Sequence, residues 1–385
     1  MTIVERPNGG RRIAIICQLD GYANGVRPVQ LHRFLEGRGH QVTLVDTSRL
    51  SRASAAPGVG AKLPSLRLGK LALYATEAAA AVLTRRWPIG RRCLSYYALL
   101  AEHRLRRAIL TSIPAIDGAD LVICETPHDV GVLSATSAHT MYDCPTPWAD
   151  ELWFEGRLTE RQHRKLRRRE AMIFDGVEYL SFHWDSYARY AVEHYGISGE
   201  NLLTLNFGCT PSPLRARFSE SPRVAYLGSL SSRFIDLPLL SRLTTLYPRI
   251  DVFGGPPPDP RLGLNYLGYA SPDILRQYQI GLITCTGDPL RQNGFSSKHL
   301  EYLAYGLPVL VPEWRPNAIT LGGSTGYTEA TFRSTITMLG NAERWQRISD
   351  EAYTQARKLT WDQTLRPLDA LLAEPSSRSR QPAPR

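Results

Sequence analysis

Cysteine is scarce in this 385-residue sequence, and none of the six cysteines has a partner at a spacing typical of a zinc site or a disulfide framework. Cys17, Cys124 and Cys285 lie inside apolar runs, where a reduced cysteine behaves as a small hydrophobic residue. The pattern therefore indicates a protein of a reducing compartment that is stabilised by neither structural zinc nor disulfides.

Segments that would export the chain or anchor it across a membrane are also missing. The N-terminal sequence MTIVERPNGGRR has no apolar stretch of the kind found in secretory signals. No apolar run reaches the roughly 18–20 residues that span a bilayer. We therefore expect a cytoplasmic protein.

The composition is that of a globular protein with an excess of positive charge. Hydrophobic residues make up 43% of the chain and charged residues 21%, which excludes a largely disordered scaffold. The formal net charge of +10 favours an anionic partner, such as a nucleotide diphosphate, anionic lipid headgroups or nucleic acid. The sequence contains no nucleic-acid recognition motif, so we expect no nucleic-acid partner.

Short apolar runs alternate with longer helix-like segments along most of the chain. The run at 12–20 is followed by a loop, GYANG, by a helix that begins near Pro28 and extends to Arg38, and by a strand at 41–46. A strand, a helix and a strand within about 35 residues form a βαβ unit and predict a parallel sheet. Further strands are expected at 121–125, 140–143 and 178–182.

The alternation restarts after residue 222, with strands expected at 223–227, 250–253, 280–284 and 308–311. A chain of this length suits two domains of about 150–200 residues. We predict an α/β fold of two Rossmann-like, doubly wound domains facing an interdomain cleft, with an N-terminal domain at 1–208 and a C-terminal domain at 222–359. The stretch between them is expected to be a linker, and 374–385 a disordered tail.

The segment NGFSSKHLEYLAYGLPVLVP at 293–312 combines a turn rich in small residues with the start of a helix. Ser296 and Ser297 fall at its first turn, Lys298 follows, and Glu301 lies one turn further along the same face. Unpaired amides at a helix N-terminus bind anions, and a carboxylate can accept two ribose hydroxyls. The pattern fits a site for a diphosphate and a ribose, and fits equally a serine N-cap and a Lys–Glu pair on a surface helix.

A second turn follows the strand expected at 223–227. Gly228 and Ser229 come directly after it, at the edge where open α/β sheets bind ligands, and Arg233 is placed to reach a phosphate there. A plain turn with a solvated arginine explains the same residues.

A third turn follows the first expected strand and contains Gly21, Asn24, Gly25 and Arg27. It does not match G-x-G-x-x-G, so the dinucleotide-binding fingerprint is absent. Its flexible glycines predict a loop that faces the cleft, and a simple turn accounts for them equally well.

Acidic residues beyond the strand at 140–143 are the candidates for proton transfer. Asp143, Asp150 and Glu151 lie in YDCPTPWADEL, and a general base must come within hydrogen-bond reach of the proton it accepts. Asp143 and Asp150 are our candidate catalytic residues. Asp150 and Glu151 are also typical of acids in the first turn of a helix.

Basic residues concentrate in the N-terminal half. Arginines alternate with apolar stretches at 85–107, and the run RQHRKLRRR occupies 161–169. Arginines around an apolar strip suit an anionic membrane surface, which would place the protein peripherally on the inner face of the membrane. Packing of these helices against the core explains the strip equally well.

The pattern S-x-K-x-x-E-Y-L-A-x-G-x-P-V at 296–309 resembles the C-terminal signature of GT-B glycosyltransferases, in particular glycosyltransferase family 4 and the xanthan-type glucuronosyltransferases. The likeness extends over most of the chain. It includes the first βαβ unit, VAYLGSLSSRFIDLPLL at 224–240 and, as a loop after the signature helix, GGSTGYT at 322–328. KLTWDQTLRPLDALL resembles their terminal helix, here about 360–373, which packs back on the N-terminal domain.

The resemblance implies a glycosyltransferase whose C-terminal domain binds a nucleotide-diphosphate sugar, UDP-linked, as co-substrate. Lys298 would contact the diphosphate, Glu301 the ribose, and Gly228 and Ser229 the phosphate region. The acceptor, a lipid-linked saccharide or a natural-product aglycone, would bind the N-terminal domain, with Arg27 and its loop on that side. No cofactor is expected, and the absence of a D-x-D triplet predicts metal-independent transfer.

One departure from the family keeps other functions open. Family 4 enzymes often carry E-x7-E, and the first acid is replaced here by Asn293. Asn293 favours one alternative, a catalytically silent nucleotide-sugar-binding protein. The other alternative is a sugar-nucleotide epimerase of the same fold.

Overall fold

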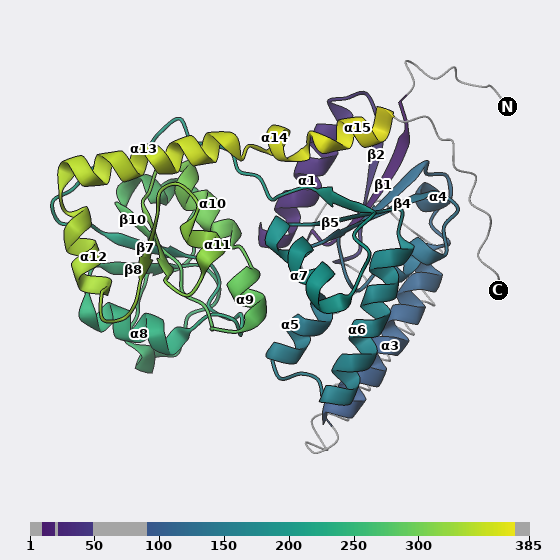
Figure 1. Cartoon of the computed structure of the whole chain (residues 1–385), viewed down its shortest axis with the longest axis horizontal. Coiled ribbons are helices and arrows are strands. Elements are labelled where there is room, and N and C mark those ends of the chain that lie inside the picture. The colour runs from purple at the N-terminus through teal and green to yellow at the C-terminus, as the bar shows by residue number, and fades with distance from the viewer. Residues whose placement is uncertain (1–9, 20–21, 49–90, 374–385) are drawn as a thin grey trace. The chain divides into compact units, whose positions relative to one another are not determined.

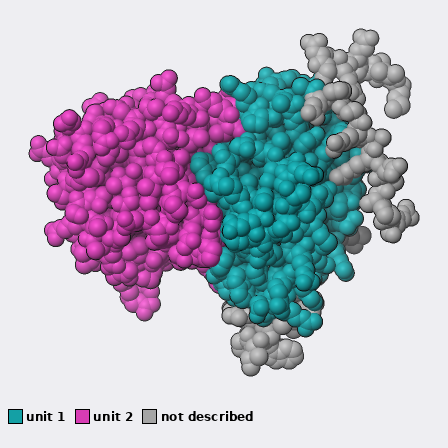
Figure 2. Space-filling model, in the orientation of Figure 1, with its two compact units in different colours: residues 1–206, 365–385 teal, residues 207–364 magenta. Residues whose placement is uncertain are grey.

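The computed structural model describes residues 10–19, 22–48 and 91–373, which fold into two compact units (Figures 1 and 2). The first unit contains the chain up to Asn206 together with the residues from Leu365 onward, and the second unit is Phe207–Thr364. Each unit holds one six-stranded sheet with helices packed around it (Figure 1). These sheets confirm the expected α/β class.

The sheet of the first unit has the strand order β2-β1-β3-β4-β5-β6, and every pairing in it is parallel. Its strands are β1 (Arg12–Cys17), β2 (Gln41–Asp46), β3 (Leu121–Cys124), β4 (His139–Cys144), β5 (Tyr179–Phe182) and β6 (Leu202–Thr204). The connecting helices are α1 (Tyr22–Glu36), α3 (Arg91–Leu110), α4 (Pro114–Asp117), the 3₁₀ helix η3 (Val130–Ser134), α5 (Trp148–Phe154), α6 (Glu160–Gly176) and α7 (Asp185–Tyr195). The order of strands reverses between β1 and β3, so this is the switch point of the sheet.

The sheet of the second unit has the order β12-β11-β10-β7-β8-β9, again all parallel. Its strands are β7 (Val224–Leu227), β8 (Ile250–Phe253), β9 (Asn265–Tyr266), β10 (Ile280–Leu282), β11 (Val309–Pro312) and β12 (Ser324–Tyr327). Its helices are α8 (Leu237–Leu246), η4 (Pro260–Leu262), η5 (Pro272–Gln277), α9 (Pro289–Asn293), α10 (Ser297–Ala304), α11 (Pro316–Ile319), α12 (Phe332–Leu339) and α13 (Ala342–Lys358). The switch point lies between β7 and β10.

The expected strands were found where the sequence is continuously apolar. Every residue of β7, β8 and β11 is buried, as in the central strands of parallel sheets covered on both faces. Helix α13 closes one side of this core with Trp345, whose indole N–H donates to Gln279 O at 2.8 Å.

The C-terminal region forms two helices, α14 (Trp361–Leu365) and α15 (Pro367–Ala373). Pro367 explains the division, because the residue before a proline disfavours helical geometry. Helix α15 belongs to the first unit, where Arg38 Nε donates to Asp369 Oδ1 at 2.5 Å.

The loop expected before Pro28 is wrong in its described part. Helix α1 already begins at Tyr22, so Asn24, Gly25 and Arg27 are helical and Pro28 lies inside the helix. Because a proline has no N–H, Pro28 cannot donate the hydrogen bond to the carbonyl four residues earlier that an interior helix residue usually makes. Gly21, the tail at 374–385 and residues 85–90 of the arginine-containing region lie outside the described residues.

Two further expectations at the edges of the second unit differ from the structure. GGSTGYT is not a loop, because Ser324–Tyr327 forms β12 and pairs with β11. The stretch expected to be a linker is bonded to the second unit: the N–H groups of Cys209, Ser212 and Ala216 donate to carbonyls of Leu359, Ala304 and Tyr305 at 2.8–2.9 Å.

Within the described residues, no helix combines the length and apolarity that crossing a bilayer requires. The five cysteines whose side chains are described are buried and form no disulfide.

Candidate active site

Helix α10 is fixed to the second sheet by Tyr302, which reaches between the two strands at the switch point. Its buried hydroxyl accepts a hydrogen bond from Leu227 N–H at 2.8 Å, at the end of β7, and lies 3.3 Å from Leu282 O, to which it donates, at the end of β10. The ring occupies the space beside Gly281, where a Cβ would lie 2.3 Å from Tyr302 Cγ. The tyrosine therefore fixes the position of α10 against the sheet.

Lys298, in the first turn of α10, lies across Gly228, the first residue after β7. A Cβ on Gly228 would lie 1.7 Å from Lys298 Cε and 2.6 Å from Nζ. Gly228 also has a φ of 146°, which other residues rarely adopt. The lysine ammonium is 5.4 Å from the centroid of the Tyr226 ring. The structure thus brings together Gly228 and Lys298, which the sequence singled out separately.

The turn after β8 packs against the same loop. A Cβ on Gly255 would lie 2.7 Å from Ser229 Oγ, and one on Gly254 would lie 3.1 Å from the carbonyl carbon of Gly228. Ser229 Oγ is hydrogen-bonded to Ser231 Oγ at 2.7 Å. Backbone turns without intervening side chains are typical of places where the main chain approaches a ligand closely.

The start of α10 leaves its first amides uncapped by the preceding serine. Ser296 is the N-cap residue, but its hydroxyl makes no capping hydrogen bond. Ser297, Lys298 and Glu301 are partly buried rather than exposed. The interpretation of this segment as an ordinary serine-capped surface helix is therefore wrong, and free amide donors suit an anion.

Lys298 and Glu301 have unusual proton affinities. Burial lowers the pKa of Lys298 to about 8, against a smaller opposing effect of the Glu301 carboxylate. Burial raises the pKa of Glu301 to about 7, and Lys298 opposes this shift. Neither side chain forms an ion pair with a described residue. Perturbed, unpaired charges of this kind are typical of binding or catalytic sites.

The remaining donor-side candidates lie around this centre. Arg233 is exposed in the segment between β7 and α8. Asn293 ends α9, and its side-chain amide donates to Pro289 O at 3.1 Å. The buried Arg315, which the sequence analysis missed, donates to Arg291 O at 3.2 Å and to Gly294 O at 2.6 Å, and so fixes the turn into α10.

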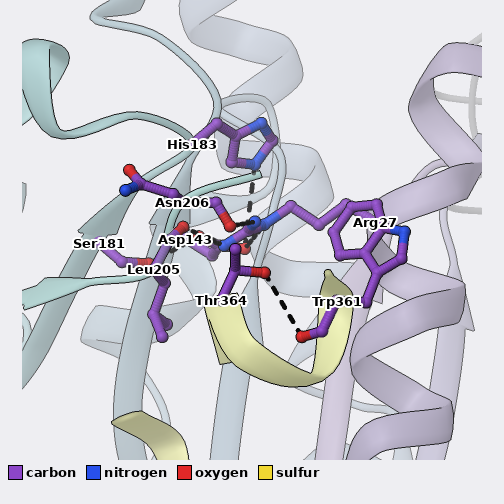
Figure 3. A network of polar contacts seen from close by, with 8 residues as sticks. All are labelled: Arg27, Asp143, Ser181, His183, Leu205, Asn206, Trp361 and Thr364. Carbon is purple, nitrogen blue, oxygen red and sulfur yellow. Dashed lines mark hydrogen bonds and ion pairs between the residues drawn. The ribbon is translucent and has the colours of Figure 1, made fainter. Parts of the chain in front are cut away.

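In the first unit, Arg27 and Asp143 form a buried ion pair (Figure 3). Arg27 Nε donates to Asp143 Oδ2 at 2.5 Å and Nη2 donates to Oδ1 at 3.0 Å, while Ser181 Oγ donates to Oδ1 at 2.6 Å. The guanidinium also donates to Asn206 O and Leu205 O at 3.0 and 2.7 Å. Burial raises the pKa of Asp143, but the combined effects of Arg27, His183 and Ser181 hold it below its usual value.

Asp150 is also buried, in the first turn of α5. Its Oδ1 is 2.5 Å from His163 Nε2, and its Oδ2 accepts from Tyr190 O–H at 2.7 Å. Burial raises the pKa of Asp150, and the bonds from His163 and Tyr190 lower it below the usual value. Both candidate bases therefore already accept hydrogen bonds on both carboxylate oxygens. Glu151 is in the same first turn and is partly buried.

Among residues 10–19, 22–48 and 91–373, no group of three or more His, Cys, Asp and Glu side chains is placed to hold a metal ion.

By sequence, the chain matches no protein-family model and none of the curated proteins. By structure it is similar to sucrose-phosphate synthase from Thermosynechococcus elongatus, with a TM-score of 0.65, 9% identity and coverage of 94% of this chain and 98% of the other. It is similar to an α,α-trehalose-phosphate synthase (UDP-forming) from Burkholderia vietnamiensis, with a TM-score of 0.62, 15% identity and coverage of 97% and 98%.

A third similar structure is a mutant of TarM from S. aureus, in complex with fondaparinux, α-GlcNAc-glycerol and UDP. The TM-score is 0.55 at 11% identity; the match covers 71% of this chain, which spans 59% of the length of TarM. At these identities the likeness is one of fold, and it shows the GT-B fold of two Rossmann-like domains that the signature at 296–309 predicted.

The ion pair in Figure 3 gives a stability prediction. We expect Arg27→Met to lower the free energy of unfolding of the first unit by about 3–5 kcal/mol, because Asp143 would be left as an unpaired buried charge. Urea denaturation followed by circular dichroism measures the change. The control is Arg164→Met, which removes a surface pair with Glu160 whose side chains are 66% and 71% exposed, and should cost less than about 1 kcal/mol. Equal losses in the two variants would contradict a structural role for the buried pair.

Proposed function

We propose that this protein is a glycosyltransferase that moves a sugar from a nucleotide-diphosphate donor to a hydroxyl group of an acceptor. The observation that carries the proposal is the placement of Lys298 over Gly228 at the switch point of the second sheet. Ligands of open α/β sheets bind at the carboxyl ends of the strands there. An unpaired ammonium, free helix amides and bare backbone turns together favour a diphosphate group.

Each residue of this site would bind a different part of the donor. Lys298 and the amides at Ser296 and Ser297 would bind the diphosphate and stabilise the negative charge that develops on it as the sugar departs. Gly228 and Ser229 would let the backbone approach the phosphates, with Arg233 as a further cation. Glu301 would accept the two ribose hydroxyls. These donors supply positive charge without a metal ion, so we propose metal-independent transfer.

The nucleotide is proposed to be UDP. Two of the structurally similar proteins support this assignment: TarM was solved with UDP, and the trehalose-phosphate synthase is described as UDP-forming. For the acceptor we propose a lipid-linked saccharide or a natural-product aglycone.

A catalytically silent nucleotide-sugar-binding protein is the second candidate. Asn293 favours it, because an amide bonded to Pro289 O stands where family 4 enzymes often have a carboxylate. Such a protein would bind UDP and turn over no donor.

The first prediction of this function concerns Lys298. We expect Lys298→Met to weaken UDP binding and donor turnover at least about tenfold, because a charge-assisted hydrogen bond is worth about 1.5–3 kcal/mol. Calorimetric titration with UDP and release of UDP from UDP-sugars measure the two effects. Lys358→Met, on the exposed face of α13, is the matched control and should bind UDP normally. Normal UDP binding by Lys298→Met would refute the donor site, and turnover abolished by EDTA would refute metal independence.

The second prediction is a pH optimum for UDP binding between about pH 7 and pH 8. Below about 7, Glu301 gains a proton and can no longer accept two ribose hydroxyls; above about 8, Lys298 loses its charge. Affinity should therefore fall on both sides, as measured by titrations across the neutral range. In Glu301→Gln, the affinity should fall at acidic pH only as far as protonation of UDP itself requires. In Lys298→Met, the fall in affinity at alkaline pH should be absent. If the affinity of both variants still fell on both sides of the optimum as in the wild type, these assignments would be contradicted.

The third prediction concerns a membrane surface, which we propose as a further partner. The exposed basic residues of α6 that support it are Arg161, Arg164, Lys165, Arg168 and Arg169. Near an anionic membrane each contributes about 1 kcal/mol. We expect the protein to sediment with phosphatidylglycerol vesicles at low salt, and the variant with all five changed to glutamine to remain in solution.

The control for this experiment is a variant with the exposed basic residues of α13 changed to glutamine (Arg344, Arg347, Arg357 and Lys358), which should sediment like the wild type. Equal sedimentation of the wild type with neutral and anionic vesicles would contradict an electrostatic attachment.

A further inference from the structure

Glu125 occupies the switch point of the first sheet. It follows β3 directly, and its N–H donates to Ile16 O at 2.9 Å, which holds it beside the end of β1. These are the two strands between which the strand order reverses. The general rule for open α/β sheets places a ligand at the carboxyl ends of such strands. Glu125 is therefore an acid at the position in the first unit where a bound molecule is expected.

The carboxyl group of Glu125 has an unfilled hydrogen-bonding capacity. Its Oε1 atom is buried and has no hydrogen-bond partner among the described residues, while the side chain as a whole is only partly buried. Buried polar atoms in folded proteins are nearly always hydrogen-bonded. An acceptor atom that is unsatisfied among the described residues, on a side chain that is only partly buried, suits the hydroxyl of a bound molecule.

The charged neighbours of Glu125 make it a strong base once ionised. Burial and the Asp143 carboxylate of β4 raise the pKa of Glu125 well above its usual range, and Arg27 of α1 opposes them. Arg27 is already bonded to both oxygens of Asp143, so its charge is shared. The thiols of Cys17 and Cys124 are the other titratable groups that interact with Glu125, and burial raises the pKa of both.

This environment differs from that of the two acids that the sequence singled out. Both oxygens of Asp143 accept hydrogen bonds from Arg27, and those of Asp150 are engaged by His163 and Tyr190. A general base needs an oxygen directed at the proton it removes. Of these three acids, Glu125 alone has a buried oxygen that no described group engages.

We propose that Glu125 is the general base of the transfer, a role that rests on the proposed function. The acceptor oxygen forms a bond to the anomeric carbon, and the bond from that carbon to the diphosphate oxygen breaks, with its electron pair remaining on the diphosphate. The acceptor proton moves to the Glu125 carboxylate, which then releases it to water. Asp143 and Arg27 act on the reaction only through the effect of their charges on Glu125.

The test compares wild type with Glu125→Gln, which keeps the shape of the side chain but cannot take a proton. Four donors are supplied with water as the acceptor: UDP-glucose, UDP-galactose, UDP-N-acetylglucosamine and UDP-glucuronic acid. We expect Glu125→Gln to slow UDP release at least about 100-fold, because general base catalysis contributes about 10²–10⁴. UDP binding, measured by titration, should be unchanged. Glu193→Gln, exposed on α7, is the matched control.

Azide separates a proton-transfer role from a structural one. The azide ion carries no proton, so its attack on the anomeric carbon needs no base. We expect sodium azide to restore UDP release in Glu125→Gln, with the glycosyl azide as product. In the wild type, UDP release with water should rise with pH to a plateau through a pKa above the usual glutamate range, and this rise should be absent in Glu125→Gln. Glu125→Asp, which keeps a carboxylate, should retain more activity than Glu125→Gln.

Each other outcome overturns the proposal in a recognisable way. Wild-type turnover by Glu125→Gln would remove Glu125 from the mechanism and leave the proposed function intact. A loss of turnover that azide does not restore would make the residue structural. A wild-type protein that binds UDP but uses neither water nor azide would overturn the transferase function together with the role of Glu125.

Discussion

The hydroxyl of Tyr302 joins the two strands at the switch point of the second sheet, and the proposed donor site depends on that contact. It bridges the Leu227 amide and the Leu282 carbonyl, so α10 cannot slide along the sheet without losing two buried hydrogen bonds. Because the Tyr302 ring fills the space beside Gly281, the strand has no room for a side chain at that position. The register of α10 then places Lys298 over Gly228, where only a glycine leaves room for it.

Each of the two units has a switch point in its sheet, but the side chains at the two switch points differ in chemistry. In the second unit the switch point carries a cation, helix amides and bare turns, which suit a diphosphate. In the first unit it carries a carboxyl group beside a neutralised Arg27–Asp143 pair, which suits an acceptor hydroxyl. The buried Arg27–Asp143 pair affects this environment through its charges. The Arg27 guanidinium is directed at Asp143 and at the carbonyls of Leu205 and Asn206, not at a bound acceptor.

Much of the proposed donor site could be predicted from the sequence, because its residues lie close together along the chain. Ser296 to Glu301 span less than two helical turns, and the run 293–312 carries both the turn and the helix period. The central strands could be predicted equally well, since burial on both faces makes their sequences continuously apolar. The short edge strands β6, β9 and β12 gave no such signal, because their residues are mostly half-exposed.

The chemistry of the first unit could not be predicted in the same way. Arg27 and Asp143 are 116 residues apart, and no local pattern pairs them. Glu125 has the appearance of the polar end of an apolar strand, and only the strand order places it at a switch point. The Gly254–Gly255 pair after β8 was a usable signal of a close backbone approach that the sequence analysis did not take up.

The most direct test of the central claim is a crystal structure of the protein with UDP. We expect phosphate oxygens within about 3 Å of Lys298 Nζ and of the first amides of α10, with the ribose hydroxyls bound to Glu301. A nucleotide bound elsewhere, with Lys298 still lying across Gly228 and touching no phosphate, would contradict it.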